Sequence, residues 1–236
     1  MTLPLFLDDP YRTEAPGRVV ALTDQGAVLD ASLFYAASGG QPGDTGVLEW
    51  PGGDVEVVDA RKGEGGAILL ALGDGPRPPV GTEVLQRLDW ARRHAHMRCH
   101  TGLHLLSVVL PFPVTGGSIT VGKGRLDFDM AEPPADLAAV EAALGTLVVA
   151  DHPVTAEWVD EAVLDRDPAL VKTLAVKPPR GAGRVRLVRI GAGEPPVDLQ
   201  PCGGTHVART GEVGRLALGK VEKKGRQNRR VTVLLP

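Results

Sequence analysis

The sequence has very little cysteine and no long hydrophobic stretch. Only Cys99 and Cys202 occur among 236 residues, which excludes a scaffold held by several disulfide bonds and is typical of a reducing compartment. No run approaches the roughly 18 consecutive apolar residues of a membrane-spanning helix. The first residues lack the basic start and small-residue cleavage site of a secretory signal. We therefore expect a cytoplasmic protein without a membrane segment, whose two thiols are ligands or core residues.

Basic residues are scarce in the first part of the chain. Residues 1–89 carry 14 acidic and 6 basic side chains, whereas residues 90–236 carry 15 and 20. Seven of these bases follow Gly211, against two acids, although the whole chain has a net charge of −3. Such an asymmetry is compatible with one half facing a polyanion. A solvated surface strand and loop would produce the same pattern, so charge alone leaves both interpretations open.

The pattern of strands and helices predicts an α+β fold with two domains. Short strands separated by glycine-rich turns, with a hairpin turn at Asp24-Gln25-Gly26, indicate a small β-barrel over residues 1–88. An α+β domain is expected over residues 89–236, with a helix packed on an antiparallel sheet. The expected barrel strands are residues 18–22, 27–29, 33–35, 46–49, 54–59 and 67–72. The later segments are helices over 89–110, 135–149 and 168–175 and strands over 125–128, 154–159, 184–190, 215–221 and 230–235.

The predicted helix over 89–110 carries a row of histidines. His96, His100 and His104 are each four residues apart and therefore share one face. Two histidines at this spacing can bind one zinc ion, because their rings project side by side. All three cannot share an ion, since the outer two lie about 12 Å apart along the helix axis. The spacing leaves the pairs 96/100 and 100/104 open, beside a row of solvated histidines without any metal.

The segment PCGGTHVARTGEVG (residues 201–214) offers a second pair four residues apart. Cys202 and His206 would complete the four nitrogen and sulfur ligands that zinc prefers. Gly203 and Gly204 allow the backbone to turn tightly between them. A buried thiol beside a polar loop residue is the alternative. Position 101 is threonine, so the His-Glu-x-x-His pattern of zinc peptidases is absent.

The order of these motifs resembles one family. HTGLHLL (100–106) followed by CGGTHVARTGEVG (202–214) resembles the editing domain of alanyl-tRNA synthetase and the free-standing AlaX proteins, which hydrolyse mischarged tRNA for alanine. FYAASGGQPGDTG (34–46) is similar to the glycine-rich element of their N-terminal barrel. Strand segments of the editing domain resemble RLDFD (125–129), RLVRIG (186–191) and KVEKKGRQNRRV (220–231). The architecture is similar to the medium-length AlaX type, a barrel plus an editing domain that acts in trans.

The resemblance implies a zinc site and a reaction. The implied zinc ligands are His100, His104, Cys202 and His206, and through the zinc they are the catalytic residues. The implied reaction is hydrolysis of the ester that joins serine or glycine to tRNA for alanine, without ATP and without a membrane partner. Such a second sieve is needed because an alanine pocket rejects serine or glycine by only about 1–3 kcal/mol.

Substrate and tRNA contacts are expected at three places. The family suggests that Gly39, Gly40 and Gln41 lie at the edge of the editing pocket, and a plain β-turn is the alternative. Three hydroxyls after the histidine helix are candidates to line the amino-acid pocket: Thr115, Ser118 and Thr120. A basic strand and turn is expected to bind tRNA phosphates through Lys220, Lys223, Lys224, Arg226, Arg229 and Arg230.

Two other functions remain open from the sequence. One is a related zinc-dependent editing deacylase for another tRNA, such as that for threonine. The other is a zinc-stabilised tRNA-binding module without catalysis. The presence of all four ligands in this chain disfavours the second.

Overall fold

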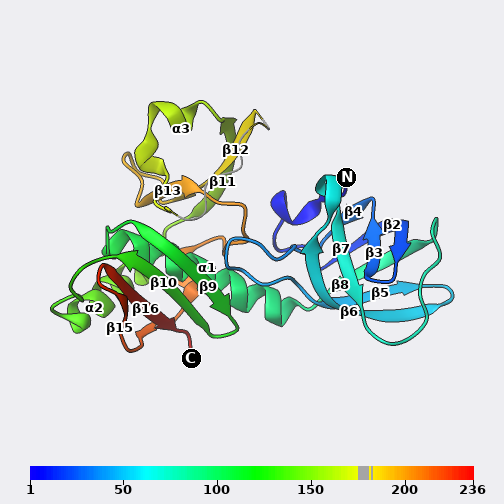
Figure 1. Ribbon diagram of the computed structural model, residues 1–236, viewed down its shortest axis with the longest axis horizontal. Coiled ribbons are helices and arrows are strands. Elements are labelled where there is room, and N and C mark those ends of the chain that lie inside the picture. Colours follow the sequence, from blue (N-terminus) through cyan, green and yellow to red (C-terminus); the bar gives the residue numbers. More distant parts are fainter. Residues whose placement is uncertain (175–180, 182) are drawn as a thin grey trace. The chain divides into compact units, whose positions relative to one another are not determined.

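A computed structural model describes residues 1–174, 181 and 183–236. The chain forms two compact units, Met1–Ala95 and His96–Pro236 (Figure 1). The boundary falls inside helix α1 (Trp90–Val109), which begins where helical periodicity was expected and ends just before Pro111. None of the helices among the described residues is long and apolar enough to cross a bilayer.

The first unit is a closed antiparallel barrel with the strand order β2-β3-β7-β6-β5-β8. This confirms the predicted barrel. A positive φ of 146° at Gly26 starts β3, and a Cβ there would lie 2.0 Å from Leu70 O, so the predicted hairpin requires glycine. The strands are β2 (Glu14–Thr23), β3 (Gly26–Leu29), β5 (Gly46–Trp50), β6 (Gly53–Lys62), β7 (Ile68–Leu72) and β8 (Glu83–Leu88), beside the short parallel pair β1 (Leu3–Pro4) and β4 (Ala31–Ser32).

Two details of the barrel differ from expectation. Residues 33–35 are buried but form no strand, because side chains take their backbone N–H groups: Gln86 Oε1 accepts from Leu33 at 2.9 Å, and Asp44 Oδ2 accepts from Tyr35 at 2.6 Å. Strand β8 was not predicted, since it directly follows the proline- and glycine-rich stretch 73–83. It closes the barrel by pairing with both β2 and β5.

The second unit contains two antiparallel sheets beside α1, which confirms the α+β class. One sheet has the order β14-β16-β10-β9, with β15 also pairing with β16, and the other has the order β11-β12-β13 (Figure 1). Gly124 on β10 packs on α1, because a Cβ there would lie 2.5 Å from Cys99 Sγ. The elements are β9 (Val114–Thr120), β10 (Lys123–Asp129), α2 (Leu137–Val149), β11 (Val154–Asp160), α3 (Val163–Arg166), β12 (Arg184–Ile190), β13 (Asp198–Pro201), β14 (Ala217–Leu218), β15 (Glu222–Gly225) and β16 (Asn228–Leu234).

The predicted helix over residues 168–175 is wrong in its described part. A single 3-10 turn covers Pro168–Leu170, and an isolated parallel bridge then joins Thr173 to Val114. The reason is pairing with the start of β9: Val114 N–H donates to Lys172 O at 2.9 Å, and Leu174 N–H donates to Val114 O at 2.8 Å. Residue 175 lies outside the described residues. The strand expected over 215–221 is likewise only the two-residue β14.

Candidate metal centre

Four side chains predicted to bind metal lie together in the second unit. His100 and His104 are one turn apart on α1, while Cys202 and His206 follow β13, and one nitrogen or sulfur atom of each lies within 4.8 Å of the others. Cys202 Sγ is 3.5 Å from His100 Nε2 and 3.3 Å from His206 Nε2. Tetrahedral zinc, with bonds of about 2.0–2.3 Å, holds neighbouring ligand atoms at roughly these separations. The donor set therefore fits one zinc-sized ion.

The fold selects between the histidine pairs that spacing left open. His96, one turn before His100, is fully buried and does not belong to the cluster. The ring centroids of His100 and His104 are 5.2 Å apart, and that of His206 lies 4.3 Å from the first and 4.5 Å from the second. Three imidazoles and one sulfur thus converge from two segments about a hundred residues apart in the chain.

A buried carboxylate orients His104. Asp198 Oδ2 accepts a hydrogen bond from His104 Nδ1 at 3.0 Å, which leaves Nε2 available to a metal. Lys172 Nζ pairs with the other carboxylate oxygen, Oδ1, and Gln200 Nε2 donates to Oδ2 at 2.7 Å. Asp198 and Gln200 are two positions apart on β13 and therefore lie on the same face of that strand. The network fixes both the tautomer and the orientation of the ring.

The same network sets the charges of His104 and Asp198. Burial alone would lower the pKa of His104, but the hydrogen bond to Asp198 and the nearby Cys202 sulfur raise it to about 9. Burial alone would raise the pKa of Asp198, but His104 and Lys172 hold it well below its ordinary value. Asp198 is therefore ionised at neutral pH, and a metal that binds His104 displaces a proton from Nε2.

Cys202 and His206 are held in ligand form by their neighbours. His206 Nδ1 is 3.1 Å from the hydroxyl of Thr101, which also accepts from Val207 N–H at 3.3 Å. Burial, together with the charge of His100, lowers the pKa of His206 to about 3, so its imidazole is neutral. Burial opposes ionisation of Cys202, but the adjacent imidazoles of His100 and His206 hold its pKa well below the ordinary value. Thiolate and neutral imidazole are the forms that bind zinc.

A buried arginine shapes the loop between Cys202 and His206. Arg186 Nη1 donates to Cys202 O at 2.8 Å and to Gly204 O at 3.1 Å, and Gly204 N–H donates to Cys202 Sγ at 3.4 Å. Neither Gly203 nor Gly204 has a positive φ. The loop therefore converges through these hydrogen bonds, and the glycine freedom that the sequence suggested is not used there.

Sequence reasoning missed the residues that support the cluster. Thr101 was noted only because a zinc peptidase would have glutamate at that position. No role in the site was predicted for Lys172, Arg186 or Asp198. The one available signal was the alternation Asp-Leu-Gln-Pro just before Cys202, which puts two polar side chains on one face of a strand. Their partners on α1 lie more than 90 residues away in the chain, so no local pattern reveals them.

The predicted glycine-rich element forms a tight turn in the first unit. Ser38 and Gln41 exchange backbone hydrogen bonds of 3.0 and 2.9 Å, and Gly39 and Gly40 between them have φ values of 57° and 84°. Positive φ at both central positions is the geometry that favours glycine. Gln41 itself is 2% exposed. The element therefore forms a β-turn, which was the alternative interpretation of the sequence. Its contact with a substrate stays a prediction.

Two of the three predicted pocket hydroxyls lie on the far face of their sheet. Gly124 faces α1, and its cross-strand partner Ile119 faces the same way. Ser118 and Thr120 flank Ile119, so strand alternation puts them on the face turned away from α1. Nothing in that position places them beside the four clustered side chains.

The third predicted hydroxyl, that of Thr115, is engaged within the sheet. Its Oγ1 donates to Asp127 O at 3.0 Å and accepts from Asn228 Nδ2 at 2.7 Å. This side chain therefore links the start of β9 to β10 and β16. Its predicted place in an amino-acid pocket has no support from these contacts.

The six predicted tRNA-binding bases divide into exposed and internally bonded groups. Arg229 is 5% exposed and donates to the backbone carbonyls of Gly225, Asn228 and Ala131. Arg230 forms two hydrogen bonds with Asp127, of 2.7 and 2.9 Å. The exposed members are Lys220, Lys223, Lys224 and Arg226, of which Lys224 pairs with Glu222 at 2.8 Å.

Comparison with known proteins adds sequence relatives over nearly the whole chain. A family model described as the threonyl and alanyl tRNA synthetase second additional domain matches residues 185–232, and one described as tRNA synthetases class II (A) matches residues 10–92. An alanine–tRNA ligase of Pyrobaculum arsenaticum is 35% identical over 234 residues, 94% of this chain. This chain spans about a quarter of that ligase's length.

Two shorter relatives match over nearly their whole length. The alanyl-tRNA editing protein AlaX-M of Saccharolobus solfataricus is 31% identical over 236 residues, and that of Methanosarcina acetivorans is 33% identical over 249 residues. In both comparisons the match covers 98% of this chain and 98% of the relative. The similarity therefore extends over both compact units.

Proposed function

The chain belongs to the family of AlaX-M alanyl-tRNA editing proteins, and we propose that it is a trans-acting deacylase for mischarged tRNA for alanine. The proposed reaction hydrolyses the ester between the wrong amino acid, serine or glycine, and the terminal ribose. The carrying observation is the convergence of His100, His104, Cys202 and His206, with their orienting partners, in a chain that matches AlaX-M proteins throughout.

We propose zinc as the metal of this site. The three imidazoles and the thiolate offer nitrogen and sulfur donors that lie within 4.8 Å of one another, and zinc prefers such donors where magnesium and calcium prefer oxygen. When bound, zinc supplies a Lewis acid that can polarise an ester carbonyl or orient a water molecule, and four protein donors favour an organising role. Asp198 keeps His104 aligned, Thr101 keeps His206 aligned, and Arg186 keeps the Cys202 loop in place.

Deacylation of defined esters tests the proposal. The protein is incubated with tRNA for alanine charged with serine, glycine or alanine, and with tRNA for threonine charged with serine, and the released amino acid is measured. We expect hydrolysis of the serine ester and little hydrolysis of the alanine ester. Equal rates for serine and alanine, or no hydrolysis at all, would contradict the proposal. Preference for the threonine tRNA would instead favour the related deacylase.

Replacing Cys202 separates catalysis from a structural metal. Cys202→Ala is expected to lose bound zinc, which metal analysis measures. Its hydrolysis rate should fall roughly 10³-fold, because such an ion lowers the barrier by several kcal/mol. Cys99→Ala is the matched control: burial raises the pKa of that thiol to about 12, and it lies outside the cluster. A Cys202→Ala protein that stays active would contradict the zinc assignment. Loss of stability without any wild-type hydrolysis would indicate the non-catalytic module.

The exposed bases of the β15–β16 hairpin are proposed to bind tRNA phosphates. Lys223 and Arg226 are exposed and are not tied to a carboxylate as Arg230 is. Lys223→Ala and Arg226→Ala should each weaken tRNA binding and reduce the salt slope of log K by about 1. Lys62→Ala, an exposed lysine on the barrel, is the control. An unchanged salt slope in the hairpin variants would remove this assignment.

The glycine-rich turn is proposed to contact the amino acid. Gln41→Ala should change the ratio of the hydrolysis rates of the serine and alanine esters if the Gln41 side chain hydrogen-bonds the serine hydroxyl. The reason is that a lost hydrogen bond costs about 1–3 kcal/mol. A purely structural role would lower both rates by the same factor. The ratio of the two rates is therefore the measurement.

A further inference from the structure

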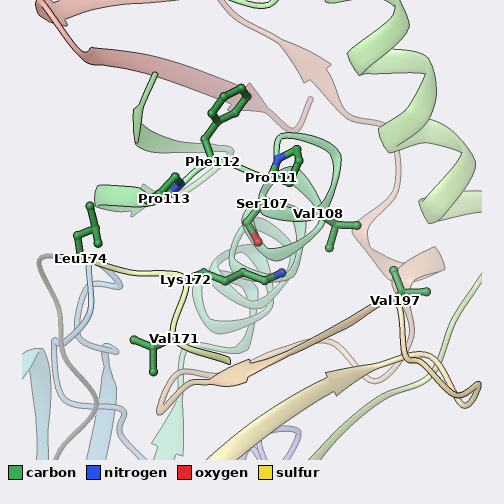
Figure 2. Close-up of a pocket in the computed structure, with 9 residues that line it drawn as sticks. All are labelled: Ser107, Val108, Pro111, Phe112, Pro113, Val171, Lys172, Leu174 and Val197. Carbon is green, nitrogen blue, oxygen red and sulfur yellow. The ribbon is translucent and has the colours of Figure 1, made fainter. Parts of the chain in front are cut away.

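The second unit contains a pocket at the end of α1 that no predicted residue lines. Its volume is about 370 Å³, in the range of sites for small ligands. Figure 2 shows Lys172 extended across it, with the Pro111–Pro113 segment on one side and Val171 on the other. The wall is mostly apolar and includes one aromatic ring: Ser107, Val108, Pro111, Phe112, Pro113, Val171, Lys172, Leu174 and Val197.

The pocket is linked to the metal cluster by two protein connections. Ser107 and Val108 follow His104 by about one helical turn, a rise of roughly 4.5–6 Å along α1. Lys172, which crosses the pocket, pairs with Asp198, and Asp198 accepts a hydrogen bond from His104 Nδ1. The pocket and the cluster therefore share the buried Asp198–Lys172 pair, on the Nδ1 side of His104.

Hydrogen bonds within the protein hold the pocket wall in place. The segment that carries Lys172 and Leu174 is fixed to β9 by the two backbone hydrogen bonds with Val114. Ser107 Oγ donates to His104 O at 2.8 Å and lies 3.4 Å from Gln200 Nε2. Both walls are thus tied to elements that also position the cluster.

The chemistry of the wall decides which part of the substrate it fits. If the proposed function is right, the ester at the cluster carries a small amino acid on one side and the terminal adenosine on the other. The two polar side chains of the wall are already engaged, Ser107 with His104 O and Lys172 with Asp198. The apolar remainder cannot distinguish serine from alanine, since that needs a polar group which alanine leaves unpaired. Apolar and aromatic surfaces do bind nucleobases by stacking. From this geometry we infer that the pocket binds the terminal adenine of the tRNA.

Fluorescence of a substituted base tests this inference without catalysis. An uncharged minihelix of tRNA for alanine carries 2-aminopurine in place of its 3′-terminal adenine, and its emission is followed as protein is added. We expect quenching with the wild-type protein. Phe112→Ala should weaken this binding on the order of tenfold, because stacking on an aromatic ring accounts for such factors. Leu174→Ala, the second exposed apolar residue of the wall, should weaken it less.

Trp158→Ala is the matched control. That ring is 45% exposed on β11, close to the 42% of Phe112, and it does not line the pocket. Both substitutions therefore remove one half-exposed aromatic ring from the same unit. Absence of quenching with the wild type, or equal quenching in Phe112→Ala, overturns the inference, and so does an equal loss in Trp158→Ala.

The deacylation assay keeps this inference distinct from the proposed function. Hydrolysis of the serine ester without quenching overturns the adenine pocket alone. Quenching that depends on Phe112, without hydrolysis of any ester, overturns the proposed function alone.

Discussion

Each compact unit contains a buried aspartate paired with a cation, and the two pairs are built differently. In the first unit, Arg93 and Asp44 are 0% and 1% exposed. The guanidinium donates to the carboxylate and to two backbone carbonyls, Pro10 O at 2.9 Å and Leu33 O at 2.7 Å. The carboxylate also accepts from Tyr35 N–H. These partners are backbone groups of loops, so the pair fixes the path of the chain.

In the second unit, the aspartate holds a side chain that has a further task. Asp198 is fully buried, but its partner Lys172 is 27% exposed and lines a pocket. Its other partner, His104, keeps one ring nitrogen directed at three further donor side chains. A buried ion pair is thus not in itself a sign of function. What indicates function here is that His104, the partner of Asp198, keeps a second ring nitrogen for the cluster with His100, Cys202 and His206.

The largest effect is expected when the Arg93–Asp44 pair of the first unit is broken. Arg93→Met leaves the Asp44 carboxylate buried without its cation, which typically costs about 3–5 kcal/mol of unfolding free energy. Urea unfolding measures it. Arg18→Met is the control, because Arg18 and Glu83 form an exposed pair worth at most about 1 kcal/mol. The amount of metal bound per folded molecule should not change in either variant. A loss below about 1 kcal/mol in Arg93→Met would contradict a structural role for the pair.

The next effect concerns the pair at the cluster. Asp198→Asn removes the carboxylate that orients His104 and should lower metal affinity about 10–100-fold, measured by competition with a chelator. Lys172→Met, which removes the other partner of Asp198, should have a smaller effect on affinity. Asp44→Asn, measured on folded protein, should leave affinity unchanged. Equal metal affinities in Asp198→Asn and the wild type would contradict the claim that Asp198, unlike Asp44, supports metal binding.

The sequence predicted local structure well and side-chain partners poorly. Helix α1 follows from its periodicity and from the proline after it, and the β2–β3 hairpin follows from its turn residues. The buried segment 33–35 was mistaken for a strand because an apolar run does not show that Gln86 and Asp44 accept its N–H groups. Those acceptors are brought close only by the closure of the barrel.

The candidate site shows the same division. Helical spacing restricted the histidines to one adjacent pair, and the order of motifs indicated which pair it was. Spacing could not reveal Asp198, whose contact with His104 spans 94 positions of the chain. It also could not distinguish Arg229, whose guanidinium donates to backbone carbonyls, from its exposed neighbour Arg226. Burial is a property of the assembled sheet and cannot be read from a run of basic residues.

A third aspartate, less buried than the other two, gives the smallest expected effect. Asp127 is 15% exposed and accepts from Arg125 Nη1 at 2.6 Å and from two nitrogens of Arg230. Burial would raise the pKa of Asp127, but its hydrogen bonds with Arg230 and Arg125 hold it below the ordinary value. The folded pKa is therefore depressed. The ionised group stabilises the fold above the unfolded pKa of about 3.9, and this contribution is lost as the pH falls through the folded pKa.

Asp127→Asn should therefore lower the unfolding free energy by about 1 kcal/mol at pH 7, the usual size for a partly exposed ion pair. The gap between variant and wild type should narrow as the pH falls below about 4, because the wild-type carboxyl is then protonated too. Urea unfolding of both proteins at several pH values measures that gap. A gap that stays constant with pH would show that the amide disturbs packing rather than charge. A gap as large as that of Arg93→Met would mean that burial does not set the strength of these pairs.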